Sequence, residues 1–278
     1  MSITSKPVSR HSVSGHASYE AAIDDRPGDG PRDAPPFAAD ARPRGREGAP
    51  SGVRFRRVGS GPPLLLIHPL GGDRRFWDVL LPRFSQLRDV IDPDLPGHGG
   101  SPRLPSADPP TPKRLAASLA DLLDELGIDR AHVGGSSLGA WVGLELASMG
   151  RALSVAAMCP SGLSHDVRRL PFASTLREMK RFRFSSWDEI DVPVTLAWGE
   201  HDVQIQPIAP PRPWIRWDVL AGCGHAVPVW DNPEEVERVL LRTSDAWSAG
   251  REEESMARDW IAEYRGEHSG AGDAALCD

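Results

Sequence analysis

A serine, an acid and a histidine that could carry out nucleophilic catalysis follow one another along the chain. Ser137 is the centre of a Gly-x-Ser-x-Gly pentapeptide at residues 135–139, and Asp202 and His225 each follow a strand-like apolar run. A serine hydroxyl is a poor nucleophile near neutral pH, so a neutral imidazole must remove its proton as it attacks a carbonyl carbon. A carboxylate fixes the tautomer of that imidazole and stabilises the imidazolium. These residues therefore predict a catalytic triad with Ser137 as nucleophile, His225 as base and Asp202 as acid.

The pentapeptide alone is weak evidence, because Gly-x-Ser-x-Gly arises by chance in a chain with 27 glycines. An ordinary loop or an N-capping serine would explain it equally well. A serine on a sharp strand-to-helix turn, however, leaves no room for side chains two residues away, and glycine meets that need. Ala131–Val133 is strand-like, and an apolar face follows the serine up to Gly150: Leu138, Trp141, Val142, Leu146 and Met149. This context favours the nucleophile.

The acid and the base each have a competing interpretation. An acid placed after the preceding strand would be Asp166, but the Gly-x-x-Asp pattern that ends at Asp202 favours the latter. Cys223 lies two residues before His225 and suggests a thiol mechanism, which we reject because this cysteine is on no nucleophile turn. His201 could touch a substrate, although a solvated loop position fits it better.

The oxyanion of an acyl-transfer intermediate needs preorganised donors, and backbone amides supply them. The amide of Leu138 directly follows the nucleophile at a helix N-terminus, and Leu70 lies in a Gly-rich loop at a strand end. Loss of one such donor typically costs about 3 kcal/mol of transition-state stabilisation. Pro69 removes a donor from the second loop and stiffens it. We therefore expect Leu70 and Leu138 to form the oxyanion hole.

Strand-like and helix-like runs alternate along the chain, which implies an α/β fold with a parallel sheet covered on both sides. The expected strands are Val53–Arg56, Leu64–Ile67, Val90–Ile91, Ala131–Val133, Val155–Met158, Val194–Trp198 and Trp217–Leu220. The expected helices cover Phe76–Phe84, Thr111–Leu126 with Thr111 as N-cap, Leu138–Met149, and a run opened by an Asn232–Glu235 capping box. The carboxyl ends of parallel strands share one edge, so the three triad candidates can converge there.

The chain resembles the α/β-hydrolase superfamily over roughly residues 53–245. Four motifs carry the resemblance: the loop His68–Gly72, the loop Asp94–Ser101, the turn at Ser137, and the paired ends Gly199–Asp202 and Gly222–His225. The order serine, acid, histidine is the one this superfamily uses. The resemblance implies a mostly parallel, doubly wound sheet with helices on both faces. It also implies serine-dependent hydrolysis of esters or related acyl compounds without a cofactor.

The sequence also predicts how two of these loops are held and how long the cap segment is. His68, His98 and Asp94 are expected to hold loops through hydrogen bonds. In relatives with a helical cap, the segment corresponding to residues 161–190 is usually far longer. We therefore predict a short or absent cap and a more open pocket. The segment has room for one or two short helices, and four apolar residues could line one of them: Leu176, Met179, Phe182 and Phe184.

The two ends of the chain differ from its centre in composition. Residues 1–51 are dominated by Pro, Gly, Ser, Asp and Arg, and such a segment cannot bury enough apolar area to offset chain entropy. We predict a disordered leader there, a hydrolase domain over residues 52–248, and a C-terminal helix with a flexible tail over residues 249–278. The helical spacing in the last segment comes from Met256, Trp260, Ile261 and Tyr264.

The composition restricts the class of partner. The net charge of −7 is spread without a basic stripe, which argues against nucleic acid or an anionic membrane. The three cysteines are far apart, which argues against a disulfide framework or a zinc site. No apolar run approaches the length of a membrane span or signal peptide. We predict a cytoplasmic protein that meets a small molecule.

The resulting hypothesis is a serine hydrolase that cleaves a small carboxylic ester or related acyl compound through an acyl-enzyme. The same fold would also support carbon–carbon bond hydrolysis, thioester hydrolysis or cofactor-free perhydrolysis. A hypothesis from another class is a non-catalytic ligand-binding or interaction protein that keeps the hydrolase scaffold. Presence of all three triad residues favours the enzyme.

Overall fold

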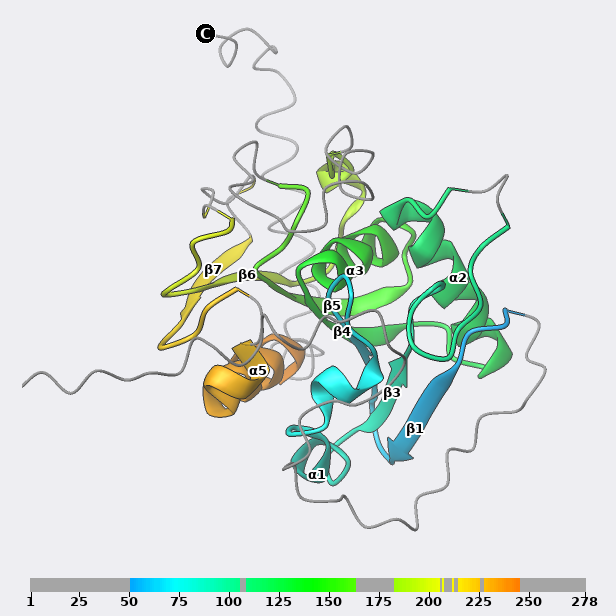
Figure 1. The fold of residues 1–278 in the computed structure, drawn as a ribbon, viewed down its shortest axis with the longest axis horizontal. Coiled ribbons are helices and arrows are strands. Elements are labelled where there is room, and N and C mark those ends of the chain that lie inside the picture. Colours follow the sequence, from blue (N-terminus) through cyan, green and yellow to red (C-terminus); the bar gives the residue numbers. More distant parts are fainter. Residues whose placement is uncertain are drawn as a thin grey trace, which may run out of the picture. The chain divides into compact units, whose positions relative to one another are not determined.

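The computed structural model describes residues 51–105, 109–163, 183–205, 207, 212, 215–225 and 228–245, and these residues contain a seven-stranded sheet (Figure 1). Its strand order is β1-β3-β2-β4-β5-β6-β7. The predicted sheet is confirmed: β2 to β7 are parallel, and only β1 at one edge pairs antiparallel, with β3. The strands are β1 Phe55–Gly59, β2 Pro63–Ile67, β3 Asp89–Pro93, β4 Ala131–Ser136, β5 Ala152–Met158, β6 Val194–Gly199 and β7 Arg216–Leu220.

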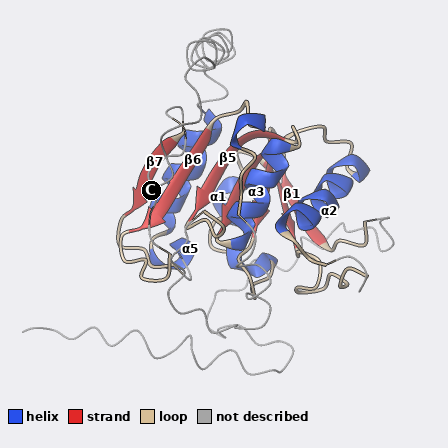
Figure 2. Cartoon of the chain, turned by 90° about the horizontal axis from the view of Figure 1, so that it is seen from above, coloured by secondary structure: helices blue, strands red, loops and turns tan. Residues whose placement is uncertain are grey.

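Helices cover both faces of this sheet, as predicted (Figure 2). On one face α2 (Pro112–Glu125) and α3 (Leu138–Ser148) pack together with the 3₁₀ helix η3 (Trp187–Glu189). On the other face the core contains residues of the 3₁₀ helix η2 (Arg74–Trp77), α1 (Leu81–Phe84), α5 (Pro228–Asp231) and helical residues 233–245. Neighbouring strand residues alternate between the two faces, so the sheet is buried from both sides.

Helix α2 begins and ends where its sequence predicts. The side chain of Thr111 accepts a hydrogen bond from the amide of Arg114 at 3.2 Å, and Pro112 is the first helical residue. Gly127 follows the C-terminus with a φ of 68°, a conformation that glycine adopts without strain. One face of the helix is buried in the core through Leu115, Leu119, Leu122 and Leu123.

The expectation of a single apolar face for α3 is wrong, because every residue from Leu138 to Ala147 is buried. The helix contacts β4, β5 and α2, so no side of it faces solvent. Small residues permit this close packing: a Cβ on Gly143 would lie 3.0 Å from the side chain of Val133. Apart from Glu145, whose carboxyl group accepts from Nε1 of Trp141 at 2.9 Å, the buried residues of this helix carry apolar side chains or none, which is typical of such a central position.

The helix expected over Phe76–Phe84 is divided into η2 and α1. Asp73 caps the first of these by accepting from the amide of Arg75 at 2.8 Å, and Pro82 lies at the start of the second. The two short pieces still bury the predicted apolar residues, including Phe76, Trp77 and Phe84. The periodicity therefore identified the buried side but not the break.

The helix over residues 233–245 follows a short helix, α5, that the sequence did not predict. Asn232 makes one half of the expected capping box, since its Oδ1 accepts from the amide of Glu235 at 3.4 Å. Asp231, at the end of α5, accepts from the amide of Gly224 at 2.8 Å. Helix α5 therefore holds the loop that carries His225.

The described residues include neither end of the chain. Among the described residues, no helix combines the length and the apolarity needed to cross a membrane. The leader up to residue 50, most of the cap segment (residues 164–182) and the C-terminal segment from residue 246 lie outside the described residues. The predictions for these segments, and the cytoplasmic location, stay predictions.

Candidate active site

Ser137 lies on the sharp turn between β4 and α3 with φ of 52° and ψ of −108°. It is one of two non-glycine residues with a positive φ in the described part of the chain. A Cβ on Gly135 would lie 2.3 Å from the carbonyl oxygen of Gly139, and a Cβ on Gly139 would lie 2.2 Å from that of Ile67. Both glycines of the pentapeptide are therefore required by close backbone approach, as the sequence predicts.

The structure brings the three triad candidates together at the carboxyl edge of the sheet. The Nε2 atom of His225 lies 3.2 Å from Oγ of Ser137, and its Nδ1 lies 2.8 Å from Oδ2 of Asp202. If the imidazole donates from Nδ1 to the carboxylate, Nε2 is free to accept the serine proton. The arrangement has the geometry that nucleophile activation needs.

The Asp202 carboxylate is buried and fully oriented. Its other oxygen, Oδ1, accepts from the amides of Gln204 at 2.8 Å and Ile205 at 3.0 Å. Burial acts to raise the pKa of Asp202, but the hydrogen bond and charge of His225 and the two amides outweigh it and lower this pKa. The carboxylate is therefore ionised at neutral pH and can stabilise an imidazolium.

Hydrogen bonds between the ends of β6 and β7 hold the acid and the base in register. The amide of Glu200 donates to Leu220 O at 3.0 Å, and the amide of His201 donates to Cys223 O at 2.9 Å. A Cβ on Gly199 would lie 2.5 Å from Cys223 O, so glycine allows the two loops to meet. The two paired motifs noted in the sequence form one unit.

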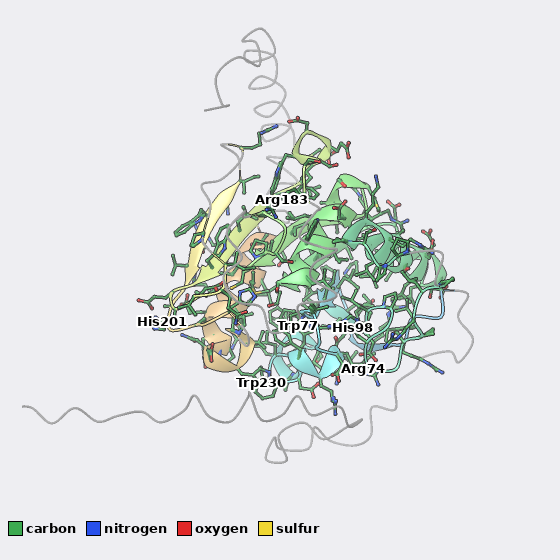
Figure 3. All side chains as sticks on the ribbon, turned by 45° about the horizontal axis from the view of Figure 1, so that its top comes forward. Arg74, Trp77, His98, Arg183, His201 and Trp230 are labelled. Atoms are coloured by element: carbon green, nitrogen blue, oxygen red, sulfur yellow. The ribbon has the colours of Figure 1, made fainter. Side chains whose placement is uncertain are left out.

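His201 itself is exposed on this loop, and Figure 3 shows it at the periphery of the described chain. The solvated position that the sequence favoured is confirmed. Asp166, the alternative acid, lies outside the described residues.

The rejection of Cys223 as a nucleophile agrees with its surroundings. The residue is buried, and its Sγ lies 3.6 Å from the carbonyl oxygens of Ala221 and Pro228. Burial raises its pKa to about 12, with a contribution from the nearby charge of Asp231. The thiol stays protonated near neutral pH, whereas a nucleophilic cysteine needs a thiolate.

The loop at the end of β2 is built around a buried, neutral His68. Its Nε2 accepts from the amide of Leu95 at 2.9 Å, so its Nδ1 carries the proton and donates to Pro69 O at 2.8 Å. Burial, with the adjacent ring of His98, lowers its pKa to about 4. The expected structural role of His68 is confirmed.

Asp94 connects the same loop to the one that follows β3. Its carboxylate accepts from the amide and side chain of Arg74, at 2.9 and 2.7 Å, and from the amide of Gly100 at 2.8 Å. Figure 3 labels Arg74, the first residue of η2, and His98, which lies in the loop after β3. Asp94 is buried, so its expected role in holding loops is also confirmed.

The predicted oxyanion donors lie on the expected elements. Leu138 is the first residue of α3, and Leu70 lies in a turn closed by a 3.1 Å hydrogen bond from the amide of Gly72 to Pro69 O. A free amide at a helix N-terminus is a favourable donor to an anion. The role of both amides stays a prediction.

The described ends of the cap segment lie side by side next to α3. The amide of Phe184 donates to Gly162 O at 3.2 Å, and the rings of Phe184 and Trp187 pack edge to face at 4.7 Å. A Cβ on Gly162 would lie 2.3 Å from the ring of Trp141. The described residues of this segment contain one short helix, η3. The nucleophile candidate Ser137 is half-buried.

Cys159 is a residue near the site that the sequence reasoning missed. It follows β5 directly, has a φ of 45°, and lies with Asp202 and His225 in one cluster. Its place just after a predicted strand, as for the triad candidates, was the signal that could have identified it.

The fold and the site define a class: α/β proteins with a mostly parallel sheet and a serine on a strand-to-helix turn at its carboxyl edge. A family model described as "alpha/beta hydrolase fold" matches residues 62–186. The chain therefore has the α/β-hydrolase fold, and the match supports the resemblance to the α/β-hydrolase superfamily that its motifs predicted.

Curated relatives match only part of the chain. It is 40% identical over 119 residues to the dihydrolipoyllysine-residue acetyltransferase component of the acetoin cleaving system of Cupriavidus necator, which covers 41% of this chain and 31% of that protein. It is 42% identical over 86 residues to a putative carbamate hydrolase, RutD, of Pseudomonas savastanoi pv. phaseolicola, covering 31% of this chain and 33% of that protein. The chain thus spans about a third of the length of these relatives.

Solved structures match more of the chain at lower identity. The N-acyl homoserine lactonase AidH, in complex with N-butanoyl homoserine, has a TM-score of 0.59 and 20% identity, covering 70% of this chain and 93% of that one. At this identity the likeness shows the fold alone.

Proposed function

We propose that the protein is a serine hydrolase that cleaves a small carboxylic ester or related acyl compound through an acyl-enzyme. The observation that carries the proposal is the chain of hydrogen bonds from Ser137 through His225 to Asp202. A hydrogen-bonded serine and imidazole on a strained turn, with a buried carboxylate behind them, is an arrangement suited to nucleophilic catalysis.

The proposed reaction begins with attack of the Ser137 hydroxyl on the substrate carbonyl carbon. Nε2 of His225 takes the hydroxyl proton, and Asp202 stabilises the imidazolium that forms. The amides of Leu138 and Leu70 donate to the oxyanion. When the tetrahedral intermediate collapses, His225 returns the proton to the leaving alcohol. Water, deprotonated by the same imidazole, then releases the acid and regenerates the serine.

Two kinds of similarity support a small acyl substrate. The chain resembles a putative carbamate hydrolase over 86 residues, and its fold resembles that of a homoserine lactonase. Carbamates, lactones and esters share a carbonyl carbon bonded to a heteroatom leaving group. The proposed chemistry is common to all three and needs no cofactor.

A fluorophosphonate probe tests the proposal, because it labels only a serine that is activated as a nucleophile. The full chain should be labelled, and Ser137→Ala should abolish labelling. Ser136→Ala is the matched control, since Ser136 is the adjacent residue and is buried at the end of β4. It should retain labelling. Labelling that survives Ser137→Ala would exclude Ser137 as the nucleophile.

The second measurement is turnover of p-nitrophenyl esters of increasing acyl length, compared between the parent chain and Ser137→Ala. Hydrolysis that depends on Ser137 supports the esterase activity, and the preferred acyl length reports the size of the pocket. Labelling of Ser137 without turnover of any ester would favour thioester hydrolysis, carbon–carbon hydrolysis or perhydrolysis. A chain that is folded but neither labelled nor active would favour the ligand-binding alternative.

A further inference from the structure

A buried thiol lies beside the acid and the base of the proposed triad. The Sγ atom of Cys159, a carboxylate oxygen of Asp202 and a ring nitrogen of His225 all lie within 4.8 Å of one another. The spacing of the cysteines argued against a metal site, but these residues are brought together only by the adjacent ends of β5, β6 and β7. Thiolate, carboxylate and imidazole are all ligands that proteins offer to Zn²⁺.

We propose that Cys159, Asp202 and His225 form an inhibitory binding site for a thiophilic divalent cation such as Zn²⁺. The charges balance: a thiolate and a carboxylate carry two negative charges, and a neutral imidazole adds a third ligand. This balance matters because the side chains of Asp202 and His225 are only 0% and 7% exposed. A buried ion without compensating charge is strongly unfavourable.

The ligand atoms must move to bind the ion, and Sγ of Cys159, which lies within 4.8 Å of the other two ligand atoms, must approach them by up to about 1 Å. Zinc lies about 2.0 to 2.3 Å from such ligands, so ligand atoms in a tetrahedral site are about 3.3 to 3.8 Å apart. Nδ1 of His225 and Oδ2 of Asp202 lie 2.8 Å apart, and would separate by about half an ångström. Three protein ligands leave the fourth position to water.

The backbone holds the Cys159 thiol toward this cluster. The residue has a φ of 45°, which is unfavourable for a side chain with a Cβ and persists where the surroundings fix it. The amide of Cys159 donates to Ala197 O at 2.7 Å, and the amide of Gly199 approaches Sγ at 3.4 Å. The thiol is therefore prepositioned by β6.

The protonation state of the thiol changes when the ion binds. Burial, and then the nearby Asp202 carboxylate, raise the pKa of Cys159 well above its ordinary value, so the thiol is protonated without the ion. As the sulfur–metal bond forms, the S–H bond breaks and its proton passes to solvent. A bound divalent cation favours the thiolate.

Binding of the ion also changes the tautomer of the His225 imidazole. The ion takes the position of the proton on Nδ1 of His225, and the neutral imidazole then carries its proton on Nε2. Nε2 is the atom that lies 3.2 Å from Oγ of Ser137, and once protonated it cannot accept the serine proton. The occupied site therefore blocks hydrolysis. This inhibition rests on the proposed function, whereas binding of the ion does not.

Cobalt binding tests the site by a readout that is independent of activity. The full chain carrying Cys277→Ser, which removes the thiol outside the described residues, is titrated with Co²⁺. One equivalent should produce a thiolate-to-cobalt charge-transfer absorption in the near ultraviolet, and Zn²⁺ should abolish it. Cys159→Ser should remove the band, while Cys223→Ser, the other buried cysteine, should retain it. Asp202→Asn should weaken Co²⁺ affinity by about tenfold or more.

Inhibition is measured in the same proteins with a p-nitrophenyl ester. Zn²⁺ should suppress turnover of the parent chain and a chelator should restore it. Mg²⁺, which prefers oxygen ligands, should have no effect. Each variant is compared with its own activity without metal. Half-inhibition of Cys159→Ser should require a Zn²⁺ concentration at least about tenfold higher than half-inhibition of the parent chain. Thermal denaturation followed by circular dichroism verifies that each variant is folded.

The outcomes separate this inference from the proposed function. Ester turnover without a Cys159-dependent band would overturn the metal site and leave the hydrolase. A band in a chain that hydrolyses nothing would support the site and overturn its inhibitory role. A band of equal strength in the parent and in Cys159→Ser would overturn the assignment of the ligands.

Discussion

At the scale of single residues, the two oxygens of Asp202 have separate partners. Oδ1 accepts two backbone amides, from Gln204 and Ile205, and Oδ2 faces the imidazole of His225. The two amide contacts fix the loop, and the contact with His225 fixes the tautomer of its imidazole. A substitution that keeps one oxygen and replaces the other should therefore separate folding from proposed catalysis.

Asp202→Asn makes this separation. The amide oxygen can still accept from the two backbone amides, but the NH₂ group then faces Nδ1 of His225 and favours the tautomer with the proton on Nε2. We expect kcat/KM for a p-nitrophenyl ester to fall by about three to four orders of magnitude. Steady-state kinetics measure the loss, and the thermal melting curve should change little.

The matched control is Asp218→Asn. Asp218 lies in β7, and its carboxylate also accepts from a backbone amide, but its charge partner is Arg238 rather than a histidine of the site. Its substitution should leave kcat/KM within about twofold, because no predicted triad residue contacts it. Equal losses in the two variants would contradict the role proposed for Asp202.

His68 offers a second prediction at this scale. Burial lowers its pKa to about 4, so the unfolded chain binds more protons than the folded chain between that pH and about 6.5. Stability therefore falls as the pH decreases through this window. Imidazole nitrogen NMR should show a neutral ring with its proton on Nδ1 at pH 5. A ring that titrates near 6.5, or carries its proton on Nε2, would contradict the hydrogen bonds described.

The residues of the candidate site differ in how far the sequence could predict them. Ser137, Asp202 and His225 were predictable because each follows a short apolar run, and the ends of parallel strands share an edge. Cys159 follows such a run too, but nothing in its spacing links it to the acid on the next strand. That adjacency depends on the order of strands in the sheet, which sequence periodicity does not contain.

At the scale of elements, the approach of α3 to the sheet depends on Gly139. A Cβ at this position would meet backbone atoms of Ile67 and His68, at 2.2 and 2.7 Å, and backbone cannot rotate away as a side chain can. Any substitution must therefore move α3 or the loop that contains Leu70. The same displacement would disturb the predicted oxyanion donors.

Gly139→Ala is expected to destabilise the fold by about 3 kcal/mol or more, because overpacking forces the backbone to shift. The control is Gly150→Ala, after the C-terminus of the same helix. Gly150 has a φ of 71° but no atom within 4 Å of its Cβ position, so only backbone strain of about 1 to 2 kcal/mol is expected. Urea denaturation of both variants measures the difference. Similar losses would show that close approach is not what requires Gly139.

The elements also show where sequence periodicity is a poor guide. It located the inner strands of the sheet, because strands buried on both faces are continuous apolar runs. At the edge, the expected strand Val53–Arg56 overlaps β1 only at its first two residues, because only one face of β1 is buried. It described α3 wrongly, since a helix buried all round has apolar residues on every face. It missed the division between η2 and α1, because both pieces bury residues on the same side of the chain.

At the scale of the whole described domain, the inner strands of the sheet are more buried than its edges. All residues of β4 and β6 and nearly all of β2, β3 and β5 are buried, and strands flank them on both sides. Strand β7 is at one edge, and its first residues, Arg216 and Trp217, are exposed. Local stability should therefore fall from the centre toward this edge.

Amide hydrogen exchange followed by mass spectrometry tests this gradient. Peptides from β2, β4 and β5 should exchange only on global unfolding, whereas those from β7 should exchange earlier through local opening. The turn that carries Ser137 should be protected with the centre, while the loop of His225 follows the edge. Protection of β7 equal to that of β4 would contradict the gradient.

The hydrogen bond between Phe184 and Gly162 has a consequence for how this scaffold could diversify. It joins the two described ends of the cap segment. Gly162 packs against the ring of Trp141, and Phe184 packs against the ring of Trp187. Because the ends already meet, a replacement segment of different length adds only a slowly growing loop-closure entropy. A segment of different length and sequence could therefore replace the cap segment and change the substrate specificity. The sheet that positions the serine, the acid and the histidine would not need to change.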